Sequence, residues 1–191
     1  MARYKEFDEG KVLDKAMRLF WKKGYTSTSI QDLEDHLGIG RRSLYNTFNN
    51  KRDLYLAALS HYQQGGGGMF PKDEPDCARN AIKEIFIDVV ETAVADETRC
   101  GCFMVNTAIE LAPHDEKIAA ISARSAKGIA AGFKELVEWG QSQERIPAEK
   151  NSTALSHFLA NSYFGLHTMA KMNPDRASLL NAVNMTLAIL D

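Results

Sequence analysis

Two short amphipathic segments joined by a glycine-bounded connection, Gly38-Ile39-Gly40, constrain the fold of this chain more than any other feature. In residues 29–37, and again in residues 41–48, apolar side chains recur at three- and four-residue steps and therefore share one helix face. Those side chains are Ile30, Leu33, Leu37, Leu44 and Phe48. A glycine in the connection permits the positive φ that a sharp reversal requires. The pattern therefore predicts a helix-turn-helix.

Helix signals on both sides of this motif predict two further helices. The segment between Asp8 and Gly24 is amphipathic, with an aspartate that can cap its start and a glycine that can end it. Thr28, followed three residues later by Gln31, predicts a capping box at the start of the second helix. Residues 51–64 carry an apolar face and predict a helix that leaves the motif.

The remainder of the chain is also helical in pattern, so the sequence predicts an all-α fold. The expected helices of this part cover residues 77–95, 103–111, 116–142, 151–172 and 176–190. We expect an N-terminal three-helix helix-turn-helix domain at residues 1–50 and a C-terminal helical bundle domain, with dimerisation helices, at residues 51–191. The second domain would start with a connecting helix (51–64) and a flexible loop (65–75). The loop is predicted from the run of glycines at 65–68, since each glycine in a helix costs about 1 kcal/mol relative to alanine.

Charge and side-chain type point to a polyanion-binding role for the N-terminal third. Residues 1–64 hold 11 Lys and Arg against 8 Asp and Glu, whereas the rest of the chain holds 12 against 17. The positions of residues 41–48 that the core does not need carry cations, hydroxyls and an amide, which are the groups that reach phosphates and base edges in a major groove. These side chains are Arg41, Arg42, Ser43, Tyr45, Asn46 and Thr47, with Lys51 at the start of the next helix. The sequence therefore predicts double-stranded DNA as a partner.

Several function classes lack their sequence signals. The chain has no phosphate loop, nucleophile elbow, HExxH motif or dinucleotide fingerprint, so we expect no enzyme, no cofactor and no bound metal. It has neither the roughly 18 uncharged apolar residues of a membrane span nor the apolar core of a signal peptide, which indicates a cytoplasmic protein without membrane contact. Cys100 and Cys102 lack CxxC spacing, and we interpret them as reduced thiols. A thiol or soft-metal sensor is the alternative.

The stretch GYTSTSIQDLEDHLGIGRRSLYNTFNNKRDLY, residues 24–55, resembles the DNA-binding signature of the tetracycline repressor (TetR) family. The matching residues are Gly24-Tyr25, Thr28, Leu44-Tyr45, Phe48, Lys51 and Leu54. The resemblance implies a homodimer on a palindromic operator, with phosphate contacts from Thr28, Tyr45 and Lys51. It implies base or backbone contacts from Arg41, Arg42, Ser43 and Asn46. Two positions depart from the family pattern: Gly40 stands where many relatives have a capping serine, and Arg42 where many have glycine.

A second stretch, GCFMVNTAIELAPHD at residues 101–115, resembles a segment of one branch of the family, where it lies in a helix between the DNA-binding domain and the ligand cavity. This resemblance implies a small-molecule effector that it does not name. His157, Asn161, Phe164 and His167 recur at helical spacing and either line a pocket or belong to a packing seam. Asn106 and Glu110 either bind a ligand or cap a neighbouring helix. The candidate ligand-binding residues are Phe103, Asn106, Glu110, Phe133, His157, Asn161 and Phe164.

The last two expected helices carry apolar residues that predict a four-helix bundle with their symmetry mates. These interface candidates are Leu155, Phe158, Leu159, Leu166, Leu179, Leu180, Val183 and Leu187. The expected function is a DNA-binding repressor that a small molecule releases from its operator. The alternatives are a thiol- or metal-responsive repressor that uses Cys100 and Cys102, and a helical binding module whose DNA-binding head is vestigial.

Overall fold

The computed structural model describes residues 8–65 and 69–191, and every regular element in these ranges is a helix. The chain divides into two compact units, residues 1–67 and 68–191. Within the described residues, no helix combines the length and the hydropathy that crossing a bilayer requires. The all-α expectation is confirmed.

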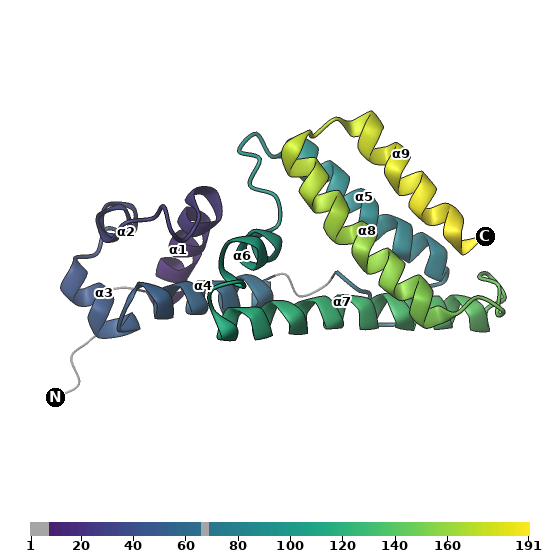
Figure 1. The fold of residues 1–191 in the computed structure, drawn as a ribbon, viewed down its shortest axis with the longest axis horizontal. Coiled ribbons are helices and arrows are strands. Elements are labelled where there is room, and N and C mark those ends of the chain that lie inside the picture. The colour runs from purple at the N-terminus through teal and green to yellow at the C-terminus, as the bar shows by residue number, and fades with distance from the viewer. Residues whose placement is uncertain (1–7, 66–68) are drawn as a thin grey trace. The chain divides into compact units, whose positions relative to one another are not determined.

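The described part of the N-terminal unit, residues 8–65, contains four helices (Figure 1). They are α1 (Glu9–Lys23), α2 (Ile30–Leu37), α3 (Arg41–Phe48) and α4 (Lys51–Gly65). Asp8 caps α1 by accepting hydrogen bonds from two backbone N–H groups, and Gly24 ends it at φ 84°. Gly38 ends α2 in the left-handed region at φ 70°, as the sequence predicts for a sharp reversal. Gly40 has φ −70°, so the reversal depends on the first glycine of the connection only.

The capping box of α2 differs from the expected one by one residue. Ser29, not Thr28, is the N-cap, and Asp32 rather than Gln31 completes the box. The usual motif has glutamate or glutamine at the third helical position. Here an aspartate at that position accepts the hydrogen bond from the N-cap backbone N–H in their place. Thr28 is fully buried instead.

The first unit extends further along the chain than the expected domain boundary at residue 50. Helix α4 packs against α1 and contributes Leu54, Tyr55 and other buried side chains to the same core. The glycine run begins with Gly65 inside α4, and residues 66–68 of the expected loop lie outside the described residues. The end of that loop is anchored, because the Trp139 indole N–H donates to the Pro75 carbonyl at 2.9 Å.

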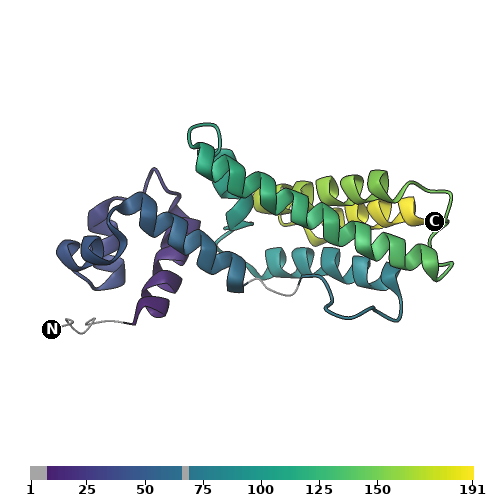
Figure 2. The ribbon, with the colours of Figure 1, turned by 90° about the horizontal axis from the view of Figure 1, so that it is seen from below.

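The C-terminal unit is a helical bundle (Figures 1 and 2). Its helices are α5 (Ala78–Ala95), α6 (Phe103–Leu111), α7 (Glu116–Ser142), α8 (Ser152–Met172) and α9 (Arg176–Leu187), followed by the 3-10 turn Ala188–Leu190. Helices α7 and α8 pack together most extensively, and α5 contacts α7, α8 and α9. One apolar core joins α5, α7, α8 and α9, with Phe86, Phe133 and Leu159 among its fully buried side chains.

This core corrects the expected dimer interface. Six of the eight candidate residues are buried inside their own subunit. They are Leu155, Leu159, Leu166, Leu179, Val183 and Leu187. Leu180 is half-buried, and Phe158, at 44% exposure, is the one that remains at the surface. Helices α8 and α9 each carry apolar residues on more than one face, and the sequence pattern identified the inward face.

Candidate nucleic-acid interface

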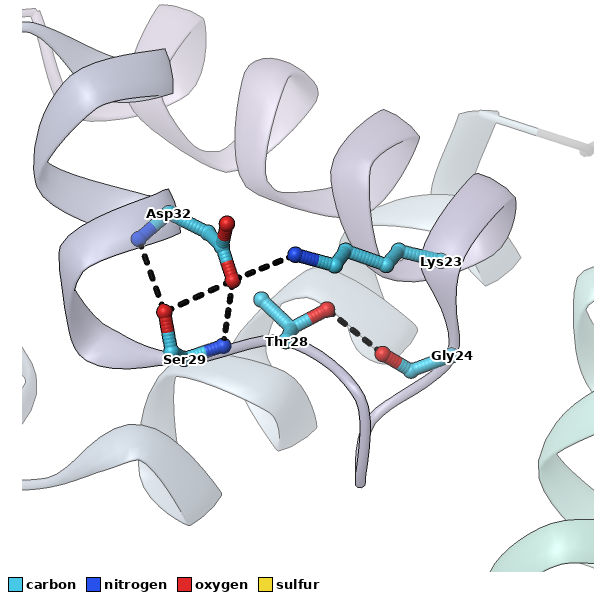
Figure 3. A network of polar contacts seen from close by, with 5 residues as sticks. All are labelled: Lys23, Gly24, Thr28, Ser29 and Asp32. Atoms are coloured by element: carbon cyan, nitrogen blue, oxygen red, sulfur yellow. Dashed lines mark hydrogen bonds and ion pairs between the residues drawn. The ribbon is translucent and has the colours of Figure 1, made fainter.

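A polar network fixes the loop that enters α2 (Figure 3). The Asp32 carboxylate accepts hydrogen bonds from the backbone N–H and the hydroxyl of Ser29, each at 2.7 Å. The Lys23 ammonium lies 2.6 Å from the same carboxylate oxygen. Hydrogen bonding from Lys23, and then from Ser29, holds the pKa of Asp32 well below its usual range. The end of α1 is thereby tied to the start of α2.

Thr28 lies inside this loop. Its side chain is 0% exposed, and its hydroxyl donates to the Gly24 carbonyl at 2.5 Å. Because the hydroxyl is enclosed and already donates to the backbone, the expected contact between the Thr28 side chain and a phosphate does not fit this structure. Thr28 holds the loop in shape instead.

An aromatic cluster lies beneath Lys51, the first residue of α4. Tyr55 packs edge-on against Phe20 and against Tyr25, with 5.0 Å between ring centroids in both pairs. The Lys51 ammonium lies 4.3 Å from the centroid of the Tyr25 ring, which is a cation–π contact. The lysine side chain therefore has a defined position near the end of α3.

Helix α3 separates its apolar and polar residues as the sequence predicts. Leu44 and Phe48 are buried, at 1% and 5% exposure, and anchor the helix to the domain. The expected DNA-contacting side chains lie on the other faces. Arg41, Arg42 and Asn46 are exposed, and Ser43, Tyr45 and Thr47 are half-buried. The Arg41 guanidinium lies 5.6 Å from the Tyr45 ring centroid, so the two side chains lie side by side on the surface.

Glu34, which no pattern in the sequence marks as part of the site, also contacts α3. The Arg41 backbone N–H donates to a carboxylate oxygen of Glu34, in α2, at 2.5 Å. Gly40, the N-cap of α3, provides no side-chain cap. The missing serine at position 40 was the available signal that another acceptor serves this helix start.

Two family models together match most of the chain. One, described as bacterial regulatory proteins of the tetR family, matches residues 12–58. The other, described as a tetracyclin repressor-like C-terminal domain, matches residues 78–186, which is more than half of the chain. This chain belongs to the TetR family. It is a helix-turn-helix transcriptional regulator and not an enzyme.

Individual TetR relatives are similar over the whole length. The uncharacterized HTH-type transcriptional regulator YezE of Bacillus subtilis strain 168 is 36% identical and is matched over 100% of both chains. The HTH-type transcriptional repressor ComR of Escherichia coli K12 is 29% identical over 98% of this chain and 90% of its own. Among solved structures, a cysteine-substituted CifR complexed with 26-bp operator DNA has a TM-score of 0.86, 27% identity and full coverage of both chains.

In the C-terminal unit of this TetR-family chain, the expected ligand-binding residues separate into two groups. Phe103 and Phe133 are buried, at 1% and 0% exposure, and Phe164 is half-buried with its ring 5.7 Å from that of Tyr163. His157 and Asn161 are exposed, so the structure does not place them in the interior. In α8, residues 159 and 166 face the core, whereas residues 157 and 161 face solvent.

Of the two polar candidates on α6, Asn106 and Glu110, Asn106 has a structural role. The Asn106 side chain donates to the Cys100 carbonyl at 2.8 Å and accepts from the Lys171 ammonium at 2.9 Å. Asn106 therefore links the loop before α6 to the end of α8. This structural role resembles the capping of a neighbouring helix, which was one of the two expected roles of Asn106. Glu110 is half-buried.

The interior also contains His167, which the helical spacing already marked as a pocket candidate, and Tyr163, which the sequence did not single out. Their rings lie 4.6 Å apart, and Tyr163 also contacts the rings of Phe86 and Phe133. The His167 Nε2 atom is buried without a hydrogen-bond partner. Burial lowers the pKa of His167 to about 4, and it raises the pKa of Tyr163 above its usual range. His167 shares helical spacing with Phe164, but spacing alone could not distinguish it from the exposed His157.

The three cysteines are free thiols. Cys100 is half-buried, with its sulfur 3.1 Å from the Thr98 hydroxyl, and Cys102 is buried. Within the ranges that the structure describes, no three His, Cys, Asp or Glu side chains gather closely enough to hold a metal ion.

Proposed function

We propose that this TetR-family regulator is a cytoplasmic homodimeric repressor that binds a palindromic operator through α3 and releases it when a small molecule binds the C-terminal unit. The single observation that carries the DNA-binding assignment is the polar outer face of α3. The opposite face of this helix is anchored in the N-terminal unit by the buried side chains of Leu44 and Phe48. The relatives support the repressor role, since ComR is named a repressor and CifR is complexed with operator DNA.

The residue roles follow from side-chain chemistry. Arg41, Arg42 and Asn46 are exposed and can reach base edges, because arginine pairs with guanine and asparagine with adenine through two hydrogen bonds each. Ser43, Tyr45 and Lys51 carry single polar groups suited to phosphate oxygens. In this proposal Thr28 contributes only by holding the loop between α1 and α2.

Selection of bound DNA from a random pool tests the proposal most directly. A palindromic product with half-sites about one helical turn apart would support a dimer with two reading heads. Arg42→Ala should then cost about 1–3 kcal/mol and relax the preference at one base pair. An unchanged preference in the Arg42 variant, or no enriched sequence for the wild-type chain, would contradict the assignment of α3.

The dimer contact in this proposal uses the outward faces of α8 and α9. Positions 154, 158, 161, 165, 168 and 172 of α8 follow alternating steps of four and three residues, which is the spacing of a coiled-coil seam. Phe158 is 44% exposed, Met172 70% and Met185, on α9, 75%. Small residues at Ala154, Gly165 and Ala182 would let a second copy approach closely. Burial of these side chains against that copy would remove apolar surface from water.

The proposed effector site lies around His167 and Tyr163. A buried nitrogen without a partner costs free energy that a ligand donor or acceptor can recover. Phe86, Phe133 and Phe164 surround Tyr163 with aromatic rings, which favours an effector with an apolar or aromatic body. Because DNA affinity depends on both heads docking together, an effector that changes the freedom of one head relative to the other would lower it strongly.

Thiol control through Cys100 and Cys102 is the second candidate. The half-buried Cys100 and the use of a cysteine-substituted CifR for the operator complex favour testing it. Loss of DNA affinity on oxidation in the wild type, with no loss in a Cys100→Ser/Cys102→Ser variant, would support thiol control. An equal response in both proteins would remove it.

A further inference from the structure

The residues at the start of α3 disfavour helix formation. The first backbone N–H groups of a helix have no intrahelical partner and are normally satisfied by a side chain at the N-cap. Gly40 has no side chain to offer, and the first turn of α3 contains no acidic residue. Arg41 and Arg42 are there instead, and cations near the positive end of a helix dipole are destabilising. An eight-residue helix is also too short to be stable by itself.

Glu34 satisfies this helix start from outside. It lies in α2, seven residues before Arg41, and its carboxylate accepts the Arg41 backbone N–H at 2.5 Å. Such a charge-assisted hydrogen bond is stronger than a neutral one, and a carboxylate at this end also interacts favourably with the helix dipole. The Gly40 carbonyl accepts from Ser43 and Leu44, so these interactions organise the first turn together.

We propose that Glu34 is a positioning residue for DNA binding. Gly40 supplies no side-chain cap, and Glu34, by accepting the first N–H of α3 from outside, keeps the first turn helical with the two arginine side chains presented outward. This inference rests on the proposed reading role of α3. Glu34 itself need not touch DNA, and a carboxylate next to a phosphate backbone would by simple repulsion weaken binding. Capping and repulsion therefore predict opposite effects of removing the carboxylate.

A rescue experiment separates these effects. Glu34→Ala removes the external cap on the Arg41 N–H. Gly40→Ser adds an internal cap that would accept from the N–H of Arg42 or Ser43 and so stabilises the same helix start through a different hydrogen bond. A Cβ at position 40 meets no atom within 4 Å, and φ −70° with ψ 153° is the conformation of a serine N-cap. Asp35→Ala is the matched control, because it removes an exposed carboxylate from the same helix, where it accepts from the Gln31 side chain and not from α3. Glu34→Gln keeps an accepting oxygen and removes the charge.

Two measurements on the full-length chain give the outcome. On the selected operator, Glu34→Ala should weaken binding by about twofold to thirtyfold, the range for loss of a helix cap. Glu34→Gln should lose less. Glu34→Ala/Gly40→Ser should return to within about twofold of Gly40→Ser alone, and the salt dependence should match the wild type because no phosphate contact is lost. Asp35→Ala should bind as well as the wild type or better.

Amide hydrogen exchange without DNA gives the second readout. Residues 41–44 should exchange faster in Glu34→Ala, and residues 42–44 should slow again in the double variant. Tighter or unchanged binding by Glu34→Ala, or a double variant as weak as Glu34→Ala, would overturn the capping role. Failure of the proposed DNA-reading role would look different: the exchange pattern would follow the cap while none of the α3 variants, including Arg42→Ala, changed DNA binding.

Discussion

The Lys51 ammonium lies 4.3 Å from the centroid of the Tyr25 ring. This contact joins the start of α4 to the residue that follows Gly24 at the end of α1. A cation–π pair at the surface contributes about 0.5–1 kcal/mol, enough to limit the positions that a flexible lysine samples. The family signature residues at 25 and 51 are thus direct neighbours.

Replacement of Lys51 by alanine should weaken DNA binding by a similar factor on every sequence. A phosphate contact carries no base information, so specificity should persist while the slope of log affinity against log salt falls by about one. Filter-binding or anisotropy titrations at several salt concentrations measure both quantities. Lys83→Ala, an exposed lysine of α5, controls for net charge. An unchanged salt slope in the Lys51 variant would argue against the phosphate contact.

Asp32→Asn should destabilise the N-terminal unit at neutral pH. The pKa of Asp32 is lowered in the folded chain, so its carboxylate stabilises the fold above the unfolded pKa of about 4. That contribution is lost as the pH falls through the lowered folded pKa. Thermal melts should therefore show a lower melting temperature for the variant at pH 7, by the modest amount expected of a solvent-screened contact, and the difference should narrow in strong acid. A difference independent of pH would mean that the ionised carboxylate is not what stabilises the loop.

Because of His167, the C-terminal unit should lose stability as the pH falls from about 6.5 to about 4. Burial lowers its pKa to about 4, so in this window the unfolded chain binds a proton that the folded chain does not. The loss has an upper bound of about 3 kcal/mol. His167→Leu should flatten this part of the stability–pH curve, measured by denaturant melts. His157→Leu, at an exposed position of α8, should keep the wild-type slope.

Met185→Glu should convert the dimer to a monomer. The substitution places a charge on the outward face of α9, where a second copy would have to bury it unpaired. Sedimentation at micromolar concentration gives the mass, and a fold check by circular dichroism excludes unfolding. Val94→Glu, an exposed apolar residue of α5, should leave the dimer intact. If Met185→Glu and Phe158→Glu both remain dimeric, the subunits associate through another surface.

The sequence by itself determined the local structure of this protein. The bounds of α3, α6 and α7 match their expected residues, and α3 faces the way its pattern predicts. Helix starts and stops depend on caps and on three- and four-residue periodicity, which are properties of neighbouring residues. A helix with one apolar stripe, such as α3, has only one face that it can bury.

The tertiary structure decided which residues of the multi-sided helices face the interior. Helix α8 carries apolar side chains on two faces, and only packing against α5, α7 and α9 selected Leu159 and Leu166 for the core and left Phe158 outside. The same holds for the cap of α3, since Glu34 is brought to Arg41 by the crossing of two helices. Such contacts depend on positions in space that no local pattern encodes.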